Sequence, residues 1–228
     1  MIVLGIETST NVCSVGLAQD GKLLREERIV EERIHSEKLL SLVQNLLSGQ
    51  QMSRDQIGAI AVSIGPGSFT GLRIGLSTAK GLCYALDVPL LAIPTFDAIA
   101  QAVAAAHSDA ENILVALDAK KGDFYVGRFK KRAGSFTAPG NANLLTEADV
   151  KKEILAGSPL LLVTDKEDLF RGLLREGGRS TDVHEFCRGD IVASLGVSKA
   201  RAKQFENPES CEPTYLKDFV VIGKNSAV

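Results

Sequence analysis

The chain has 228 residues, of which 45% are hydrophobic and 24% are charged, and its formal net charge is −2 at pH 7. This composition is typical of a folded protein with one large domain or two lobes. The near-neutral charge gives no global electrostatic reason to bind nucleic acid or a membrane surface, and no segment approaches the ~18 apolar residues of a membrane-spanning helix.

The cysteines and the first residues indicate the cellular compartment. The four cysteines lie far apart and form no Cys-x-x-Cys pair, so we expect neither a disulfide framework nor a cysteine zinc site. The chain starts with a strand-like apolar run instead of a signal peptide. We therefore expect a cytoplasmic protein without membrane contact.

The first half of the chain predicts alternating strands and helices. Period-two patterning and turn residues predict an antiparallel meander of strands over 1–7, 12–18 and 23–30. The elements predicted next are a helix over 36–47, a strand over 57–64, a helix over 70–86, a strand over 88–93 and a helix over 95–106. The loop-like stretch after them predicts a lobe boundary, which gives the domains 1–107 and 108–228.

The second half repeats this order in a shorter form. The predicted elements are strands over 113–118 and 124–130, a loop over 132–143, a helix over 146–155, a strand over 160–164, and helices over 166–176 and 191–205. We expect the last helix to pack back on the first lobe. A βββαβα unit present twice predicts an α/β protein with the two-lobed actin-like ATPase (ASKHA) fold.

The glycine-rich run IGPGSFTGLRIG at 64–75 joins a predicted strand to a predicted helix. Its glycines allow close backbone approach and Ser68 or Thr70 can cap the helix, so the turn is a candidate anion site. It is not a Walker A loop, because no lysine follows its last glycine. The other interpretation is a strand-to-helix turn that packs tightly against its neighbours.

A second polar turn follows the first strand, with an acidic residue and several hydroxyls. In a nucleotide-binding fold such a turn can hold a metal-bound phosphate, whereas the alternative is local hydrogen bonding between side chains and backbone. The candidate phosphate-binding residues are Glu7, Thr8, Ser9, Gly65, Gly67 and Ser68.

The helix predicted over 70–86 carries two rows of small residues. One row is Gly71, Gly75 and Ala79, and the other is Ser77, Gly81 and Ala85. Glycine lowers helix stability, so these rows indicate close approach of another backbone, either from the same chain or from a second subunit. We expect Gly75→Leu or Gly81→Leu to disrupt association and leave the monomer folded.

Four stretches resemble the TsaB (YeaZ) family: LGIETSTNVCSVGL, IGPGSFTGLRIGLSTAKGL, ALDAKKGDFYVGRF and EPTYLKDF. Members of this family are non-catalytic actin-like subunits of the bacterial machinery that makes threonylcarbamoyladenosine on tRNA, at the adenosine next to the anticodon. The resemblance implies a homodimer that also pairs with the catalytic paralogue TsaD, together with the P-loop ATPase TsaE. The tRNA would be reached indirectly, through the complex.

The resemblance also implies where these contacts lie. The interface would be formed by the helix from 36 and the glycine-rich helix, through His35, Leu39, Leu42, Gly71, Leu72, Arg73, Gly75, Thr78, Ala79 and Leu82. The paralogue binds a metal through a His-x-x-x-His pair, and the matching positions here are Thr95 and Ile99. We therefore expect no metal and no catalytic residues in this chain. The cofactor that the resemblance allows is ATP or ADP, bound at the subunit interface.

Two other functions compete with the scaffold subunit. An ATP-dependent small-molecule kinase would share the fold and the glycine-rich turn, but its first phosphate loop would usually carry Asp where this chain has Glu7. A metallopeptidase is disfavoured, because the three histidines include no pair at a spacing of four.

Overall fold

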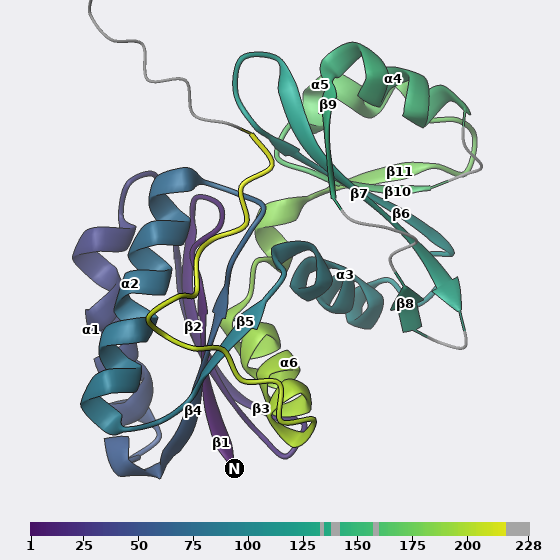
Figure 1. The fold of residues 1–228 in the computed structure, drawn as a ribbon. Helices are drawn as coiled ribbons and strands as arrows, with labels where there is room; N and C mark the ends of the chain where they lie inside the picture. The colour runs from purple at the N-terminus through teal and green to yellow at the C-terminus, as the bar shows by residue number, and fades with distance from the viewer. Residues whose placement is uncertain (133–134, 138–141, 157–159, 218–228) are drawn as a thin grey trace, which may run out of the picture.

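The computed structural model describes residues 1–132, 135–137, 142–156 and 160–217, which form two lobes with a sheet in each (Figure 1). The elements of the first lobe are β1 (Ile2–Glu7), β2 (Val12–Gln19), β3 (Lys22–Val30), α1 (His35–Gly49), β4 (Ile57–Ser63), α2 (Phe69–Leu86), β5 (Leu90–Ile93) and α3 (Thr95–Ala106). Its sheet has the order β3-β2-β1-β4-β5. The predicted meander is confirmed, because β2 pairs antiparallel with both β1 and β3.

The first sheet is covered on both faces, which explains why its central strands are apolar throughout. Leu4 and Ile6 of β1 pack in one core with side chains of α1 and α2. Val3 packs on the opposite face, in a second core with side chains of α3 and α6 (Gly189–Arg201). Adjacent residues of a strand point to opposite faces, so each face of this sheet needs its own apolar set.

The second lobe repeats the plan of the first. Its elements are β6 (Asn112–Asp118), β7 (Asp123–Arg132), β8 (Ser135–Thr137), β9 (Asn143–Thr146), α4 (Glu147–Ala156), β10 (Leu161–Thr164), α5 (Glu167–Phe170) and β11 (Arg179–Asp182). The sheet order is β11-β10-β6-β7-β8, and β9 also pairs with β7. The series β7-β6-β10-β11 therefore corresponds to β2-β1-β4-β5, as a duplicated βββαβα unit requires.

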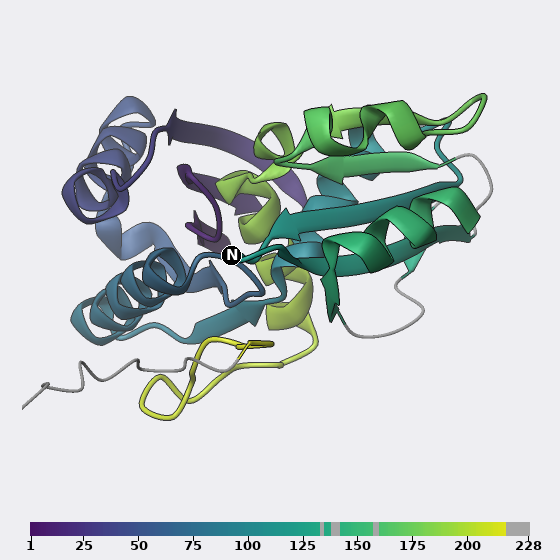
Figure 2. The same ribbon diagram turned by 90° about the horizontal axis from the view of Figure 1, so that it is seen from above.

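Helix α6 lies against the first sheet although it is late in the sequence (Figures 1 and 2). The helix comes so close that a Cβ atom on Gly5 of β1 would lie 2.1 Å from the carbonyl oxygen of Gly189. The lobe boundary predicted at residue 108 falls between α3 and β6, and the chain crosses back before α6. The first lobe is thus built from two separate stretches of sequence.

Several element boundaries predicted for the second half of the chain are wrong. The helix predicted over 166–176 is only α5 and a 3₁₀ turn over Arg171–Leu173, in a stretch interrupted by Gly172. The helix predicted over 191–205 ends at Arg201, just before Lys203 takes a left-handed φ of 56°. The loop predicted over 132–143 contains β8, and its residues 133–134 and 138–141 lie outside the described part. Strand β11 was not predicted, because RSTD is polar and lacks alternation.

Candidate functional site

The main cavity of the described residues lies between the lobes and has a volume of about 440 Å³. The first lobe lines it with the β1–β2 turn and the start of α2, including Ser9, Gly67 and Ser68. The second lobe lines it with the ends of β6 and β10 and the β6–β7 turn, including Asp118 and Lys120. Both turns that the sequence singled out therefore reach this cavity, at least in part.

The glycine-rich turn packs tightly against the β1–β2 turn. The amide of Ser68 donates a hydrogen bond to the carbonyl oxygen of Ser9 at 2.7 Å. The amide of Gly71 donates to Ser68 Oγ at 3.2 Å, so Ser68 is the cap of α2. A Cβ atom on Gly67 would lie 2.3 Å from the Ser9 carbonyl oxygen. These amides are used within the chain, which favours the interpretation of a packed strand-to-helix turn.

Gly65 is also committed to internal contacts. Its amide donates to Thr95 Oγ1 at 3.1 Å, and its carbonyl oxygen accepts from the Thr95 amide at 2.9 Å. Its φ of 114° suits glycine, and a Cβ atom there would lie 2.7 Å from the Thr214 carbonyl oxygen. Gly65 therefore connects the turn to α3 and lies close to Thr214. It does not line the cavity.

Glu7 and Thr8 lie beneath the cavity. Both are fully buried, and neither belongs to the cavity lining, whereas Ser9 does. Glu7 Oε1 accepts a hydrogen bond from the Ser9 amide at 2.6 Å, and burial raises the pKa of the Glu7 carboxyl. A buried carboxyl with a raised pKa favours its neutral form. Glu7 and Thr8 are thus set back from the cavity, and a role for them in binding phosphate stays a prediction, whereas Ser9, Gly67 and Ser68 line the cavity.

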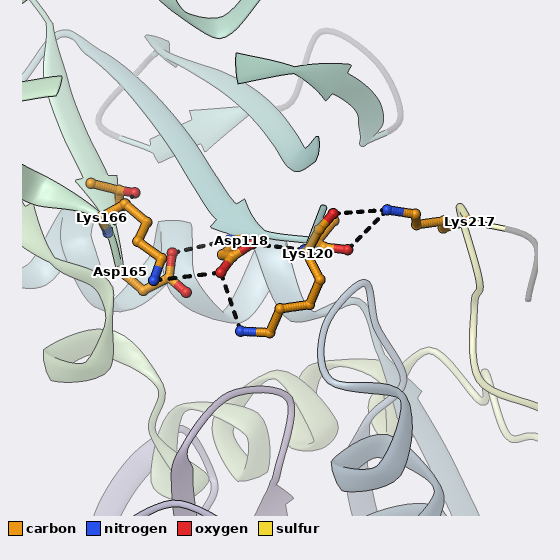
Figure 3. Close-up of polar contacts among 7 residues, drawn as sticks. Asp118, Lys120, Asp165, Lys166 and Lys217 are labelled. Carbon is orange, nitrogen blue, oxygen red and sulfur yellow. Dashed lines mark hydrogen bonds and ion pairs between the residues drawn. The ribbon is translucent and has the colours of Figure 1, made fainter. Parts of the chain in front are cut away.

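Two carboxylates that were not predicted meet at the second-lobe wall (Figure 3). Asp118 is the last residue of β6 and Asp165 follows β10, and because these strands are parallel neighbours their ends lie side by side. The Asp118 amide donates to Asp165 Oδ1 at 3.0 Å. Asp118 Oδ2 accepts from Lys120 Nζ at 3.1 Å and pairs with Lys166 Nζ at 3.5 Å. The sequence signal was an aspartate at the end of one buried strand and another directly after the next strand of the sheet.

The two carboxyls differ in their proton affinity. Burial acts to raise the pKa of Asp118, but hydrogen bonds from Lys120 and the charges of Lys120 and Lys166 outweigh it, so this pKa is lowered. Burial and the Asp118 charge raise the pKa of Asp165. Asp118 is thus ionised at neutral pH. Among the described residues no group of three or more His, Cys, Asp or Glu side chains could hold a metal ion.

Most of the predicted interface residues pack inside the chain. The buried ones are His35, Leu39, Leu42, Gly71, Leu72, Gly75 and Ala79. A Cβ atom on Gly75 would lie 2.1 Å from Thr8 Oγ1, so this row of small residues faces the β1–β2 turn. This contact changes the expectation for Gly75→Leu, which we now expect to disturb the fold of the monomer. Arg73 is exposed, and Thr78 and Leu82 are half-buried.

The second row of small residues on α2 faces outward. Ser77, Gly81 and Ala85 are exposed, and a Cβ atom on Gly81 would meet nothing within 4 Å. Tyr84 beside them is 93% exposed, and Leu40 of α1 is 57% exposed. Helices α1 and α2 lie on the side of the molecule away from the second lobe (Figure 2). This outer surface is called the α1–α2 face below.

The two positions where the resemblance led us to look for metal ligands, Thr95 and Ile99, have contacts within the fold. Thr95 is buried and holds Gly65 through the hydrogen bonds described above. Ile99 is fully buried in the core that α3 shares with the first sheet. Neither side chain is presented to the cavity between the lobes.

A family model described as "TsaD: tRNA N6-adenosine threonylcarbamoyltransferase" matches residues 28–152, more than half of the chain. The tRNA threonylcarbamoyladenosine biosynthesis protein TsaB of Haemophilus influenzae is 34% identical over 125 residues, which cover 55% of this chain and 52% of that protein. The chain thus matches about half the length of this relative. The Bacillus subtilis protein of the same name is 26% identical over 216 residues, covering 95% of this chain and 86% of that protein.

Solved structures agree with this similarity. YeaZ from Pseudomonas aeruginosa superposes with a TM-score of 0.79 at 26% identity, covering 94% of this chain and 99% of that one. Component A of the (R)-2-hydroxyglutaryl-CoA dehydratase of Acidaminococcus fermentans has a TM-score of 0.53 at 10% identity, over 89% of this chain and 99% of its own, so it shares the fold alone. The predicted two-lobed actin-like fold is confirmed. No helix among the described residues is long and apolar enough to cross a membrane.

Proposed function

Because this chain belongs to the TsaB (YeaZ) family, we propose that it is an accessory subunit in the biosynthesis of threonylcarbamoyladenosine on tRNA. The observation that carries the proposal is the similarity to YeaZ, which extends over 94% of the chain at a TM-score of 0.79. In this proposal the protein works in the cytoplasm and reaches tRNA through its partners, in keeping with its net charge of −2.

We further propose that the subunit is not itself catalytic. Thr95 and Ile99 are engaged in packing at the positions where the paralogue TsaD has its metal ligands. A hydroxyl that holds a backbone amide and an aliphatic side chain in a core cannot replace two imidazoles on a metal. These contacts support a scaffold and give no support to a kinase or a peptidase.

The α1–α2 face is the proposed contact surface for a second copy and, in exchange, for TsaD. It combines the exposed side chains of Leu40 and Tyr84 with Gly81, where another helix could approach without meeting a side chain. Exposed aromatic and aliphatic groups beside small residues are typical of helix-to-helix interfaces. The buried row that includes Gly75 would support this face from within the chain.

For the nucleotide, we propose that ATP or ADP is held at a subunit interface of the complex and not by the first turn of this chain. Glu7 and Thr8 lie beneath the cavity, and the amides of Ser68 and Gly71 already have partners in the chain. A change at Glu7 should therefore leave nucleotide binding by the assembled complex intact.

Co-purification tests the scaffold proposal. The tagged chain is isolated from its own cells and the bound proteins are identified by mass spectrometry. We expect a paralogue with a His-x-x-x-His pair and a small P-loop ATPase, and we expect Gly81→Leu to reduce the recovery of the paralogue. A partnerless protein that consumes ATP in the presence of a small metabolite would overturn the proposal in favour of the kinase.

A further inference from the structure

The last described residues form an extended segment, 202–217, which we call the C-terminal strap. It leaves the end of α6, runs along the first lobe and ends beside the second lobe (Figure 1). The strap is fixed to the first lobe by backbone hydrogen bonds: the Glu206 amide donates to the Leu90 carbonyl oxygen at 2.9 Å, and the Thr214 amide donates to the Ile64 carbonyl oxygen at 2.7 Å. It therefore follows the edge of the first sheet and the strand that enters the glycine-rich turn.

An aromatic contact fixes the strap to the start of α2. The rings of Tyr215 and Phe69 have centroids 5.1 Å apart. Arg73 Nε donates to Tyr215 Oη at 2.9 Å, and the Arg73 guanidinium carbon lies 3.7 Å from the centroid of the Phe69 ring. Tyr215 of the strap therefore has a tilted ring contact with Phe69 and a hydrogen bond from Arg73, whose guanidinium carbon also lies 5.7 Å from the centroid of the Tyr215 ring.

Two residues later, Lys217 reaches the other lobe (Figure 3). Its ammonium donates to the carbonyl oxygens of Ala119 and Lys120, at 3.1 and 2.9 Å, and to Asp123 Oδ2 at 2.8 Å. All three acceptors belong to the β6–β7 turn and its flanks, and the Lys217 side chain is only 25% exposed. Three charge-assisted bonds use every proton of the ammonium.

The contact of Lys217 adds a second connection between the two lobes. The two lobes already share a core, in which Val3 and Phe96 of the first lobe pack together with Val115 and Leu161 of the second. Lys217 lines the cavity between the lobes. The shared core and the contacts of Lys217 at the cavity are therefore two separate connections between the lobes.

We propose that the C-terminal strap is a tie that sets the opening of the cleft between the lobes, with Lys217 as its fastening residue. The strap is anchored on the first lobe by Thr214 and Tyr215, so Lys217 transmits that anchorage to the β6–β7 turn. The opening of the cleft then depends on the motif EPTYLKDF, whose first six residues form the end of the described strap. This inference does not depend on the proposed partners.

Hydrogen exchange of the full chain tests the tie. Lys217→Met keeps the aliphatic stem and removes the ammonium. We expect amides over 118–123 to exchange about tenfold faster, the change expected from losing roughly one charge-assisted bond. The matched control is Lys121→Met, because Lys121 lines the same cavity and its ammonium has no hydrogen bond or ion pair to another described residue. Unchanged exchange in Lys217→Met, or an equal increase in both variants, would overturn the proposal.

A second measurement guards against a variant that does not fold. Asp123→Asn removes one acceptor charge from the other side of the contact, and spin labels placed on α1 and α4 report the distance between the lobes. We expect a broader distance distribution in Lys217→Met and an intermediate one in Asp123→Asn, with the parent chain narrowest. Identical distance distributions in all three proteins would show that the strap does not control the opening of the cleft, and would overturn the proposal.

Discussion

Glu7 illustrates what the sequence does not reveal about a single residue. An acidic residue followed by hydroxyls after a strand suggests a phosphate loop, but the pattern does not give the depth of each side chain. Here Ser9 lines the cavity, while Glu7 and Thr8 are fully buried and Thr8 lies against Gly71 and Gly75 of α2. The burial of each side chain depends on the tertiary fold, so the sequence pattern alone could not give it.

The buried carboxyl predicts a measurable dependence of stability on pH. Burial raises the pKa of Glu7 in the folded chain, so the folded state holds this proton more tightly than the unfolded chain. Its contribution is complete below the unfolded pKa, near about pH 4, and is lost as pH rises towards the folded pKa. Glu7→Gln cannot ionise and keeps an acceptor for the Ser9 amide.

We therefore expect Glu7→Gln to melt at a higher temperature than the parent chain at pH 7, and the difference to vanish near about pH 4. Calorimetry at both pH values measures it. The same variant should leave ATP binding by the assembled complex unchanged, as titration calorimetry would report. A Glu7→Gln protein that is less stable at pH 7, or a complex that loses nucleotide, would refute this account of Glu7.

At the scale of elements, α2 was predicted well because its evidence is local. Apolar spacing, a serine cap and a run of glycines specify a helix and its start, and Ser68 is indeed the cap. The predictions for α5 and β11 failed because the local sequence does not determine these elements. Strand β11 is a short polar segment that forms by pairing with β10. The row of α2 that contains Gly75 is a site of close approach within the chain, whereas close approach at the row that contains Gly81 stays a prediction. Which row faces inward follows only from the fold.

The two rows predict opposite effects of the same substitution. Gly75→Leu places its side chain against Thr8 and should destabilise the fold by about 3 kcal/mol, the cost of overpacking a core. Gly81→Leu meets open space and should gain up to about 0.8 kcal/mol of helix propensity while it weakens association. Urea unfolding measures the first effect and light scattering the second. An undisturbed dimer in Gly81→Leu would remove α2 from the interface.

At the scale of the molecule, the repeated order of strands and helices was enough to predict two lobes of one plan. The sequence could not give the relation between them. The pairing of Asp118 with Asp165 and the fastening of Lys217 on the β6–β7 turn join residues that are 47 and 94–98 positions apart. The cleft is therefore a product of long-range contacts, although each of its walls carries a recognisable motif.

The central claim is that the chain supports threonylcarbamoyladenosine formation on tRNA without catalysing it. The most direct measurement is the threonylcarbamoyladenosine content of tRNA, by mass spectrometry of nucleosides, in bacteria depleted of their own TsaB and supplied with this chain. We expect modification to return with the parent chain and to fall with Gly81→Leu, which we expect to fold normally because a Cβ atom at Gly81 meets nothing within 4 Å. The same bacteria can also be supplied with the TsaD and TsaE of the organism from which this chain comes. If the chain is folded and both partners are present but the tRNA still lacks threonylcarbamoyladenosine, the account is contradicted.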